Sequence, residues 1–286
     1  MNLVAEGVSV SQACAWLELS RSSYYYHSVQ RDDSQLEVAI EKVLGEFPTY
    51  GTRRVTQQMR RAPQKLVANR KRVQRVMRQK ECLQPVKRQK TCTTNSLHPY
   101  PRYPNLVMGL VIDHPDQVWA GDITYIRLKN RFIYLASILD VYTRSARGWC
   151  LSLWLNQELA LCALRQALAK GCPEIHHSDQ GIQYAAQAYI DLLKSHHIQI
   201  SMAAVGKAEE NGFAERFMRT LKEEEVNLSE YEDFADAQNQ IGYFIESVYN
   251  TKRLHSALGY ITPVEFEAAF QLAITQHVVE APLSEA

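Results

Sequence analysis

The sequence predicts an α/β protein with a mixed five-stranded sheet flanked by helices and preceded by small all-α modules. From about residue 117, three β-rich runs with short polar breaks are followed by alternating helical and β-rich segments. This βββ-α-β-α-β-α order is typical of a mixed sheet that carries helices on its faces. The residues before about 84 instead place apolar side chains at helical spacing, which predicts separate helical modules.

These changes of pattern divide the chain into five segments. The 286 residues are enough for two domains and one sizeable core. A linker is expected before the core because residues 84–115 contain several prolines and show no period. We expect a helix-turn-helix-like segment at residues 1–30 and a basic helical DNA-binding domain at 31–90. A linker at 91–115, the α/β core at 116–270 and a tail at 271–286 are expected to follow.

Composition excludes several classes of protein. Hydrophobic residues make up 46% and charged residues 22%, as in soluble globular proteins. No apolar run reaches 18 residues, so we expect no membrane span, and the N-terminus lacks the pattern of a signal peptide. The six cysteines are scattered without a C-x-x-C pair, which favours reduced thiols in the cytoplasm over a zinc site or a disulfide framework.

The first module reads as two brief helices within Ser9–Ser28. Ser9 or Ser11 is expected to cap the first helix and Ser20 the second. Ala13, Cys14 and Leu17 are expected to face inward. Arg21 and Tyr24 then lie at the start of the second helix, where helix-turn-helix proteins place DNA-contacting residues. A small helical hairpin without DNA contacts has the same pattern.

The second helical region is strongly basic. Its first helix is expected to bury Leu36, Ile40, Val43 and Leu44, and its last helix to bury Val67, Val73, Val76 and Met77. Between residues 51 and 100 there are 14 Lys and Arg against one acid, Glu81; the whole chain carries only +1. Such asymmetry indicates a surface for a polyanion, although a solvated basic helix is the alternative. The expected DNA contacts here are Arg53, Arg54, Arg70, Lys71, Arg72, Arg75 and Arg78.

Two aspartates belong to different β-rich runs of the core. Asp122 lies inside "WAGDITYI", near the expected centre of the sheet, and Asp179 ends the run "EIHHSD". Adjacent strands lie about 4.8 Å apart, so the two carboxylates can come close, where they would repel each other. A divalent cation removes this conflict. Oxygen ligands favour Mg²⁺ or Mn²⁺ over zinc.

A third acid, Glu215, is expected on a long helix that starts at about Glu209. Phe213, Phe217 and Leu221 would form its sheet-facing stripe. Lys222 follows Glu215 by seven residues and therefore shares its helix face. The preceding stretch "AAVGKAEENG" is small and flexible enough to be a mobile loop over a site.

Other polar residues have structural interpretations. His176 and His177 point to opposite sheet faces by strand alternation, which favours packing roles over a shared metal. His255 and Ser256 resemble a nucleophile pair, but a structural or DNA-contacting loop is favoured since no acid is near them in sequence. Asp140 is considered as support for the site, Asn211 is expected to start a helix, and residues 223–225, "EEE", are expected to be solvated.

The motifs resemble one known family. "WAGDITYI", "HSDQGIQY" and "ENGFAERFMRTLK" are similar, in order, to the three catalytic blocks of DDE transposases in the retroviral-integrase superfamily. Thirty-five residues separate Asp179 from Glu215, which is the spacing of that family. The likeness is to the OrfB-type product of frameshifting bacterial insertion sequences. It extends to "YGTRRV", "RKRVQRVMR" and the C-terminal block "YNTKRLHSALGYITPVEF".

The resemblance implies an RNase H-like integrase catalytic core and two-metal phosphoryl transfer. Asp122, Asp179 and Glu215 would be the catalytic acids and would hold two Mg²⁺ or Mn²⁺ ions, and Lys222 would contact the DNA phosphate near the cut. The activity would be DNA strand cleavage and strand transfer, that is, integration of an insertion sequence. The implied partners are the insertion-sequence ends, target DNA, an upstream OrfA-type product, fused or separate, and further copies of the chain on DNA. The implied location is the bacterial cytoplasm, at the nucleoid.

Two other functions stay open at this point. One is a transposase-derived regulator that binds DNA without cutting it, against which the intact acid triad argues. The other is a different RNase H-like nuclease, such as a junction resolvase or a nuclease of RNA–DNA hybrids. The basic helical region and the C-terminal block favour a transposase over such a nuclease.

Overall fold

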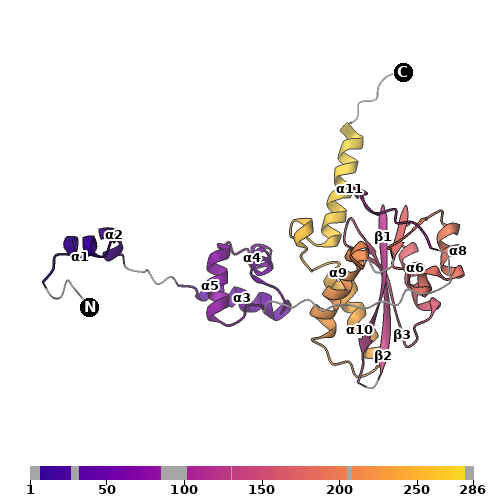
Figure 1. The fold of residues 1–286 in the computed structure, drawn as a ribbon, viewed down its shortest axis with the longest axis horizontal. Helices are drawn as coiled ribbons and strands as arrows, with labels where there is room; N and C mark the ends of the chain where they lie inside the picture. Colours follow the sequence, from indigo (N-terminus) through magenta and orange to yellow (C-terminus); the bar gives the residue numbers. More distant parts are fainter. Residues whose placement is uncertain (1–6, 27–31, 85–101, 130, 205–207, 281–286) are drawn as a thin grey trace.

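The computed structural model describes residues 7–26, 32–84, 102–129, 131–204 and 208–280 (Figure 1). A helical pair, a three-helix domain and an α/β core follow one another along the chain (Figure 1). In the described part of the chain, no helix is both long enough and apolar enough to cross a membrane.

The first helical pair consists of α1 (Val10–Trp16) and α2 (Arg21–Tyr24). The expected caps are confirmed: Ser9 accepts a hydrogen bond from the backbone N–H of Gln12, and Ser20 from that of Ser23. Ala13 and Cys14 are buried, but Leu17 is 57% exposed because α1 ends before it. The expectation that Leu17 packs inward is therefore wrong.

The helical domain packs three helices around one apolar core. They are α3 (Ser34–Glu46), α4 (Thr52–Arg60) and α5 (Arg70–Gln79). Six of the residues expected inside are buried, namely Leu36, Ile40, Val43, Val73, Val76 and Met77, and Leu44 packs against them partly buried. Val67 was expected among them but is 78% exposed, since it precedes the first turn of α5.

The α/β core confirms the mixed five-stranded sheet. Its strands are β1 (Val118–Arg127), β2 (Phe132–Asp140), β3 (Ala146–Ser152), β4 (Ile175–Ser178) and β5 (Gln199–Met202). The strand order is β3-β2-β1-β4-β5. The first three strands are antiparallel, and β4 and β5 join the other side of β1 in parallel. The central strand is therefore β1, which carries Asp122.

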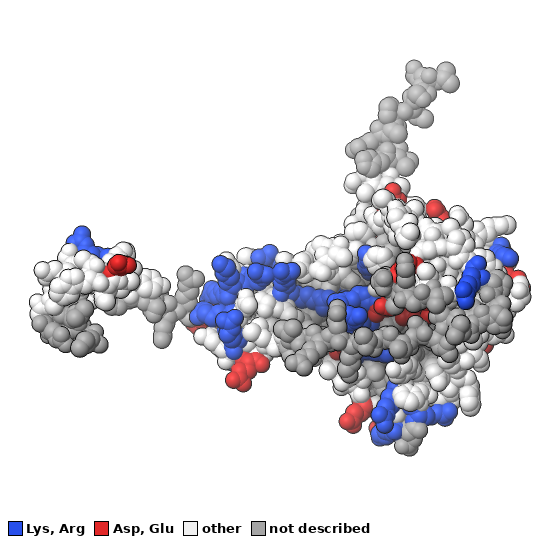
Figure 2. All heavy atoms as spheres, viewed as in Figure 1, with Lys and Arg blue, Asp and Glu red and all other residues white. Residues whose placement is uncertain are grey.

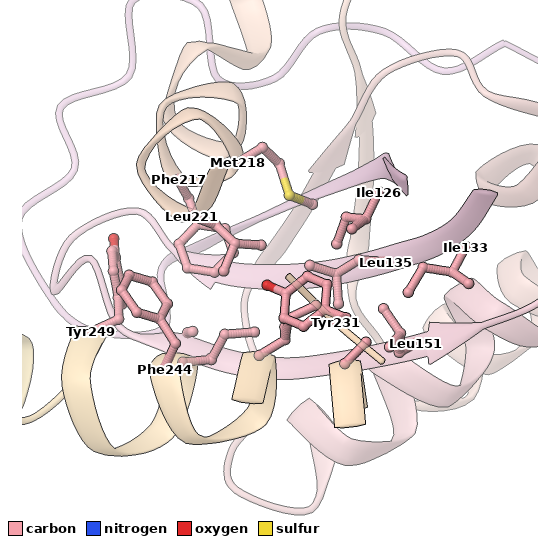
Figure 3. Close-up of a cluster of buried hydrophobic side chains, with 14 of the residues drawn as sticks. Ile126, Ile133, Leu135, Leu151, Phe217, Met218, Leu221, Tyr231, Phe244 and Tyr249 are labelled. Atoms are coloured by element: carbon pink, nitrogen blue, oxygen red, sulfur yellow. The ribbon is translucent and has the colours of Figure 1, made fainter. Parts of the chain in front are cut away.

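Helices cover both faces of this sheet. One face packs on α6 (Gln157–Leu168), α7 (Ile182–Ala185) and α8 (Gln187–Ser195). The other packs on α9 (Gly212–Leu221) and α10 (Phe234–Tyr243), each followed by a π-helical segment, Lys222–Val226 and Phe244–Tyr249. Figure 3 shows this second face, where Phe217, Met218 and Leu221 of α9 reach toward apolar side chains of β1 and β2.

The described ends of the core differ from the expected boundaries. The linker expected at 91–115 does not extend to 115: the backbone N–H of Leu106 donates to Ser201 Oγ at 2.9 Å, and Pro104 O accepts from Met202 of β5. The tail expected from 271 is not separate, because α11 (Pro263–Glu280) continues through that position. Within the expected mobile loop, residues 205–207 lie outside the described residues, and Ala208–Asn211 form a 3₁₀ turn.

Side-chain contacts join the helical domain to the C-terminal part of the core. The backbone N–H of Leu254 donates to the buried Tyr50 hydroxyl at 2.9 Å. The ion pairs across this junction are Arg54–Glu224, Arg61–Glu265 and Lys252–Glu46. The helical domain and the C-terminal part of the core are therefore in direct contact, and both contribute side chains to the surface along this junction.

Candidate active site

The register of β1 and β4 brings Asp122 and Asp179 together. Gly121 and Ser178 are the last paired residues of the two parallel strands, so the aspartates are the next residue on each. Neighbouring strands lie about 4.8 Å apart, which places the carboxyl groups side by side at the end of β4. Each is held by the backbone: Asp122 Oδ1 accepts from the N–H of Ile123 at 2.8 Å, and Asp179 Oδ1 from that of Gly181 at 2.9 Å.

A glycine close in sequence to each aspartate leaves space that the packing around the site uses. A Cβ at Gly121 would lie 3.1 Å from Tyr184 Cε1 and 3.2 Å from His176 Nε2, both on buried side chains. A Cβ at Gly181 would lie 2.9 Å from Asp179 Oδ1 itself. In the motifs "GD" and "DQG", the glycine therefore leaves room for side chains that pack at the site, because it has no Cβ.

Glu215 lies on α9, which crosses β1 next to Asp122. The side-chain amide of Asn211, 3% exposed at the start of α9, donates to the Gly121 carbonyl at 2.9 Å. Phe217 and Leu221 are buried against the sheet, as expected. Phe213, expected in the same stripe, is 42% exposed and lies under the Arg144 guanidinium, with the ring centroid 4.1 Å away.

Asp179, Glu215 and Lys222 all lie close enough to Asp122 to affect its charge. The pKa of Asp122 is raised to about 8, mainly by burial and also by the nearby Asp179 and Glu215 carboxylates, while the hydrogen bond from Ile123 and the Lys222 charge act to lower it. The Lys222 ammonium also lies 4.7 Å from the ring centroid of Tyr125 on β1. The structure thus brings Asp122, Asp179, Glu215 and Lys222 within electrostatic reach at one place on the sheet.

This donor set fits a hard divalent cation. The acids offer only oxygen ligands, which suit Mg²⁺ or Mn²⁺, and a bound cation would favour the ionised form that burial disfavours at Asp122. Within the described ranges, no group of three or more His, Cys, Asp or Glu side chains is arranged as a complete ion site. The arrangement is therefore a pair of adjacent aspartates with a glutamate on the neighbouring helix, rather than a complete metal-coordination site.

The two histidines before Asp179 have packing roles, as predicted. His176 Nε2 lies 2.9 Å from the Tyr189 hydroxyl, and His177 Nδ1 lies 2.8 Å from Ser201 Oγ. Burial lowers the pKa of both rings, that of His176 to about 3, so both are neutral.

Asp140 does not support the acid site. It is fully buried opposite Trp119, three residues before Asp122 on β1, where it accepts a hydrogen bond from Thr143 and pairs with Arg147 at 3.3 Å. His255 is buried too, with its Nε2 3.3 Å from Arg253 Nη1. A structural role for the His255 loop, one of its two expected roles, agrees with this contact.

The prediction that residues 223–225 are solvated is wrong for two of them. Glu224 accepts hydrogen bonds from Arg253 at 2.6 and 2.7 Å and from Arg54 at 3.2 Å. Burial alone would raise the pKa of Glu224, but the bonds from Arg253 hold it below its usual value. Glu225 accepts from Ser229 and Tyr231. These partners come from other parts of the chain or from the turn that follows the π-helical segment, so a run of three acids did not reveal them.

The predicted DNA contacts divide into two groups. Arg72 and Arg75 both bond to Asp33, at 2.7 and 2.5 Å, and Arg54 bonds to Glu224, so these charges are partly used within the protein. The remaining basic candidates of the helical domain are exposed: Arg53, Arg70, Lys71 and Arg78. Arg21 and Tyr24 are exposed on α2, which packs on α1 and not on the acid site.

Sequence reasoning missed two features near the site. One is the bond from Asn211 to Gly121, for which the only signal was the "ENG" before the helix. The other is a cavity of about 210 Å³ that Arg144 and Arg216 line together with Arg54 and Arg253. These arginines are far apart in the sequence, so no local pattern links them.

Comparison with known proteins gives consistent matches over the helical domain and the core. Two protein-family profiles described as an integrase core domain match residues 113–208 and 196–263, and one described as an HTH-like domain matches residues 30–90. The insertion element IS600 uncharacterized 31 kDa protein of Shigella sonnei is 33% identical over 269 residues, which are 90% of this chain and 98% of that protein.

Two further matches cover about half of the chain. The transposase for insertion sequence element IS904 of Lactococcus lactis subsp. lactis is 40% identical over 156 residues, 54% of this chain and 62% of that protein. The catalytic core domain of HTLV-2 integrase, solved in complex with magnesium, is 19% identical over 54% of this chain and 97% of its own, with a TM-score of 0.45.

Proposed function

Because the chain belongs to the family of insertion-sequence transposases that carry an integrase core domain, we propose that it cuts DNA strands at the ends of an insertion sequence and joins them to a target. The catalytic acids in this proposal are Asp122, Asp179 and Glu215. The observation that carries it is the register of β1 and β4, which places Asp122 and Asp179 next to each other, with Glu215 close enough to affect the charge of Asp122.

Both reactions break a phosphodiester bond. Cleavage hydrolyses the bond with water, and strand transfer replaces it with a new phosphodiester bond. In cleavage, a water oxygen attacks the phosphorus and the bond to the 3′-oxygen breaks, which leaves a 3′-hydroxyl. In strand transfer, that 3′-hydroxyl attacks a phosphodiester of the target, and a new bond forms as the old one breaks. Bound Mg²⁺ or Mn²⁺ ions, two in this proposal, would activate the attacking oxygen and stabilise the leaving one.

The side chains of the site have separate roles in this proposal. Asp122 and Asp179 hold the cations, fixed by their bonds to the backbone N–H groups of Ile123 and Gly181. Glu215 completes the ligand set from α9. Lys222 binds the DNA phosphate next to the cut as a point charge.

The partners of the chain belong to the same proposal. The HTH-like domain and its exposed arginines would hold the DNA, and two copies or more would act on the two ends. An upstream OrfA-type product, fused or separate, would add recognition of the ends. Adding that product should raise end-specific binding in a gel-shift assay, and no gain would count against this partnership. The chain would act in the cytoplasm, at the nucleoid.

Strand transfer tests the proposed function. The substrate is DNA that spans the end of the insertion sequence, and the comparison is between wild type and Asp179→Asn with Mg²⁺. We expect Asp179→Asn to lose at least about 100-fold in rate, a loss of the size that follows removal of one electrostatic group from an active site. The matched control is Asp191→Asn, an exposed aspartate on α8, which should keep wild-type activity.

Three outcomes would overturn the proposal. Equal rates for wild type and Asp179→Asn, or no activity in either, would leave a DNA-binding regulator as the better reading. Cleavage of the RNA strand of RNA–DNA hybrids without preference for insertion-sequence ends would favour another RNase H-like nuclease.

A further inference from the structure

A small cavity on α9 is lined by four arginines. Its volume is about 210 Å³, and Arg54, Arg144, Arg216 and Arg253 line it. The α9 side chains that face it are Phe213, Arg216, Phe217 and Thr220, whose spacing of three, four and seven residues defines one helix face. Glu215 is not among the lining residues, so the cavity and the acid site use different faces of α9.

Arg144 is held in the cavity although one of its donors has no partner. Its guanidinium stacks on Phe213 at 4.1 Å from the ring centroid, and its Nη1 is buried without a hydrogen-bond partner among the described residues. The nearby Asp140 carboxylate instead accepts from Thr143 and pairs with Arg147. A buried charged donor without an acceptor is unfavourable, and an acceptor from outside the chain would remove this cost.

The cavity also carries more positive than negative charge. Glu224 neutralises part of it by bonding to both Arg54 and Arg253. Among the described residues, neither Arg144 nor Arg216 forms an ion pair with an acidic side chain. His255, which lines the cavity, has its pKa lowered to about 2 by burial and by Arg253, Arg54 and Arg144, a sign of the positive field there. An anion would relieve this repulsion.

A second cavity extends the basic surface toward the helical domain. It has a volume of about 480 Å³ and shares Arg54, Arg216 and Ser256 with the first, so the two adjoin. Arg53 and Arg70 of the helical domain also line it. Figure 2 shows Lys and Arg side chains as a band that runs from the helical domain onto the core. Such a band suits an extended polyanion better than an isolated small anion.

We propose that the smaller cavity binds one phosphate of the DNA backbone through Arg144 and Arg216, while the neighbouring nucleotides follow the larger cavity. This inference rests on the proposed function, since it makes the cavity a positioning site for the DNA that the acids cut. The volume of about 210 Å³ is below the roughly 300–1,000 Å³ of small-molecule sites, and therefore suits a phosphate group rather than a whole nucleotide.

The position of the cavity on α9 separates this phosphate from the cut. Glu215 does not line the cavity, although Arg216 beside it does. A phosphate in the cavity would therefore lie on a different side of α9 from the acids, and not at the scissile phosphate. Arg144 and Arg216 would set the distance between the cut and the DNA held by the helical domain.

The salt dependence of DNA binding tests this proposal. The affinity of full-length wild type, Arg216→Gln and the double variant Arg144→Gln/Arg216→Gln for duplex DNA is measured by fluorescence anisotropy at several salt concentrations. The double variant should bind about tenfold more weakly, as expected for lost charged hydrogen bonds, and its salt slope should fall by about 0.9, the value for one phosphate contact. In Arg216→Gln, the affinity and the salt slope should change in the same direction. Because Arg216 is exposed, this variant should fold as wild type does, whatever the effect of replacing Arg144.

Arg165→Gln is the matched control, because Arg165 is an exposed arginine on α6, paired with Glu158. It should keep the wild-type affinity and slope. Wild-type slopes in both cavity variants would overturn the proposal. A second arm adds inorganic phosphate at constant ionic strength and follows the melting temperature. If phosphate stabilises wild type but not the double variant while the DNA slope is unchanged, the cavity binds a free anion and the DNA assignment falls.

The wild type in the same experiment separates this inference from the proposed function. If wild type transfers strands and the cavity variants bind DNA as wild type does, only the inference fails. If wild type neither binds DNA nor transfers strands, the proposed function fails and the inference falls with it.

Discussion

The side-chain amide of Asn211 donates a 2.9 Å hydrogen bond to the backbone carbonyl of Gly121, the residue that precedes Asp122. This bond ties the start of α9 to the central strand. Since Glu215 lies four residues further along the same helix, the bond also fixes the height of Glu215 above the two aspartates. A residue outside the predicted acid set therefore holds that set together.

Replacing Asn211 should weaken both the fold and the site. Asn211→Ala removes a buried donor from the Gly121 carbonyl, which should lower the free energy of unfolding by about 1–3 kcal/mol. Strand transfer should fall as well, because Glu215 is no longer held in position. Urea denaturation and the strand-transfer rate measure the two effects. The exposed Asn227→Ala is the control, and a wild-type rate for Asn211→Ala would contradict the positioning role.

The pair Glu224–Arg253 should contribute far more to stability than an exposed pair. Their side chains are 11% and 4% exposed, and removing one partner of a buried pair typically costs about 3–5 kcal/mol because the other charge stays buried. Glu224→Gln should approach this loss. Glu158→Gln, at the 59% exposed partner of Arg165, should cost at most about 1 kcal/mol. Equal losses in urea denaturation would mean that Glu224 is not a buried anchor.

The neutral His255 ring should make stability fall in acid. Burial and Arg253 lower its folded pKa to about 2, so between this value and its unfolded pKa near 6.5 the unfolded chain binds more protons than the folded chain. Its contribution to stability is therefore present above about pH 6.5 and is lost as pH falls below that, by up to about 1.4 kcal/mol per pH unit.

The variant His255→Gln isolates this contribution. Glutamine keeps an acceptor for Arg253 but does not titrate in this range. His176 and His177 act with the same sign, so the quantity to compare is the difference between wild type and variant. The stability of His255→Gln should depend less steeply on pH between about 4 and 6.5 than that of wild type. Parallel stability curves for the two proteins would show that His255 is not held neutral.

The sequence alone was sufficient for the sheet and for the two aspartates. The alternating runs and their order predict the strands, and a carboxylate in each of two core runs predicts that the two lie close together, as the register of β1 and β4 confirms. The place of Glu215 depended on the family resemblance, since helical spacing fixes which residues share its face but not which helix crosses β1.

Long-range pairs and local irregularities could not be predicted in this way. Arg72 was predicted to contact DNA because its helix is basic, but Asp33 lies 39 residues away and neutralises it. Glu224 was expected in water as part of an acidic run, but Arg253 and Arg54, which are distant in the sequence, bond to it. Phe213 was placed in the buried stripe, whereas Arg144, from a distant turn, covers its ring.

The position of bound Mn²⁺ tests the central claim most directly. Anomalous diffraction from crystals grown with Mn²⁺ should show a peak about 2.0–2.3 Å from carboxylate oxygens of both Asp122 and Asp179, with Glu215 facing it, and no such peak in Asp179→Asn crystals. Peaks only at other places on the chain, or an unchanged peak in Asp179→Asn, would contradict the account.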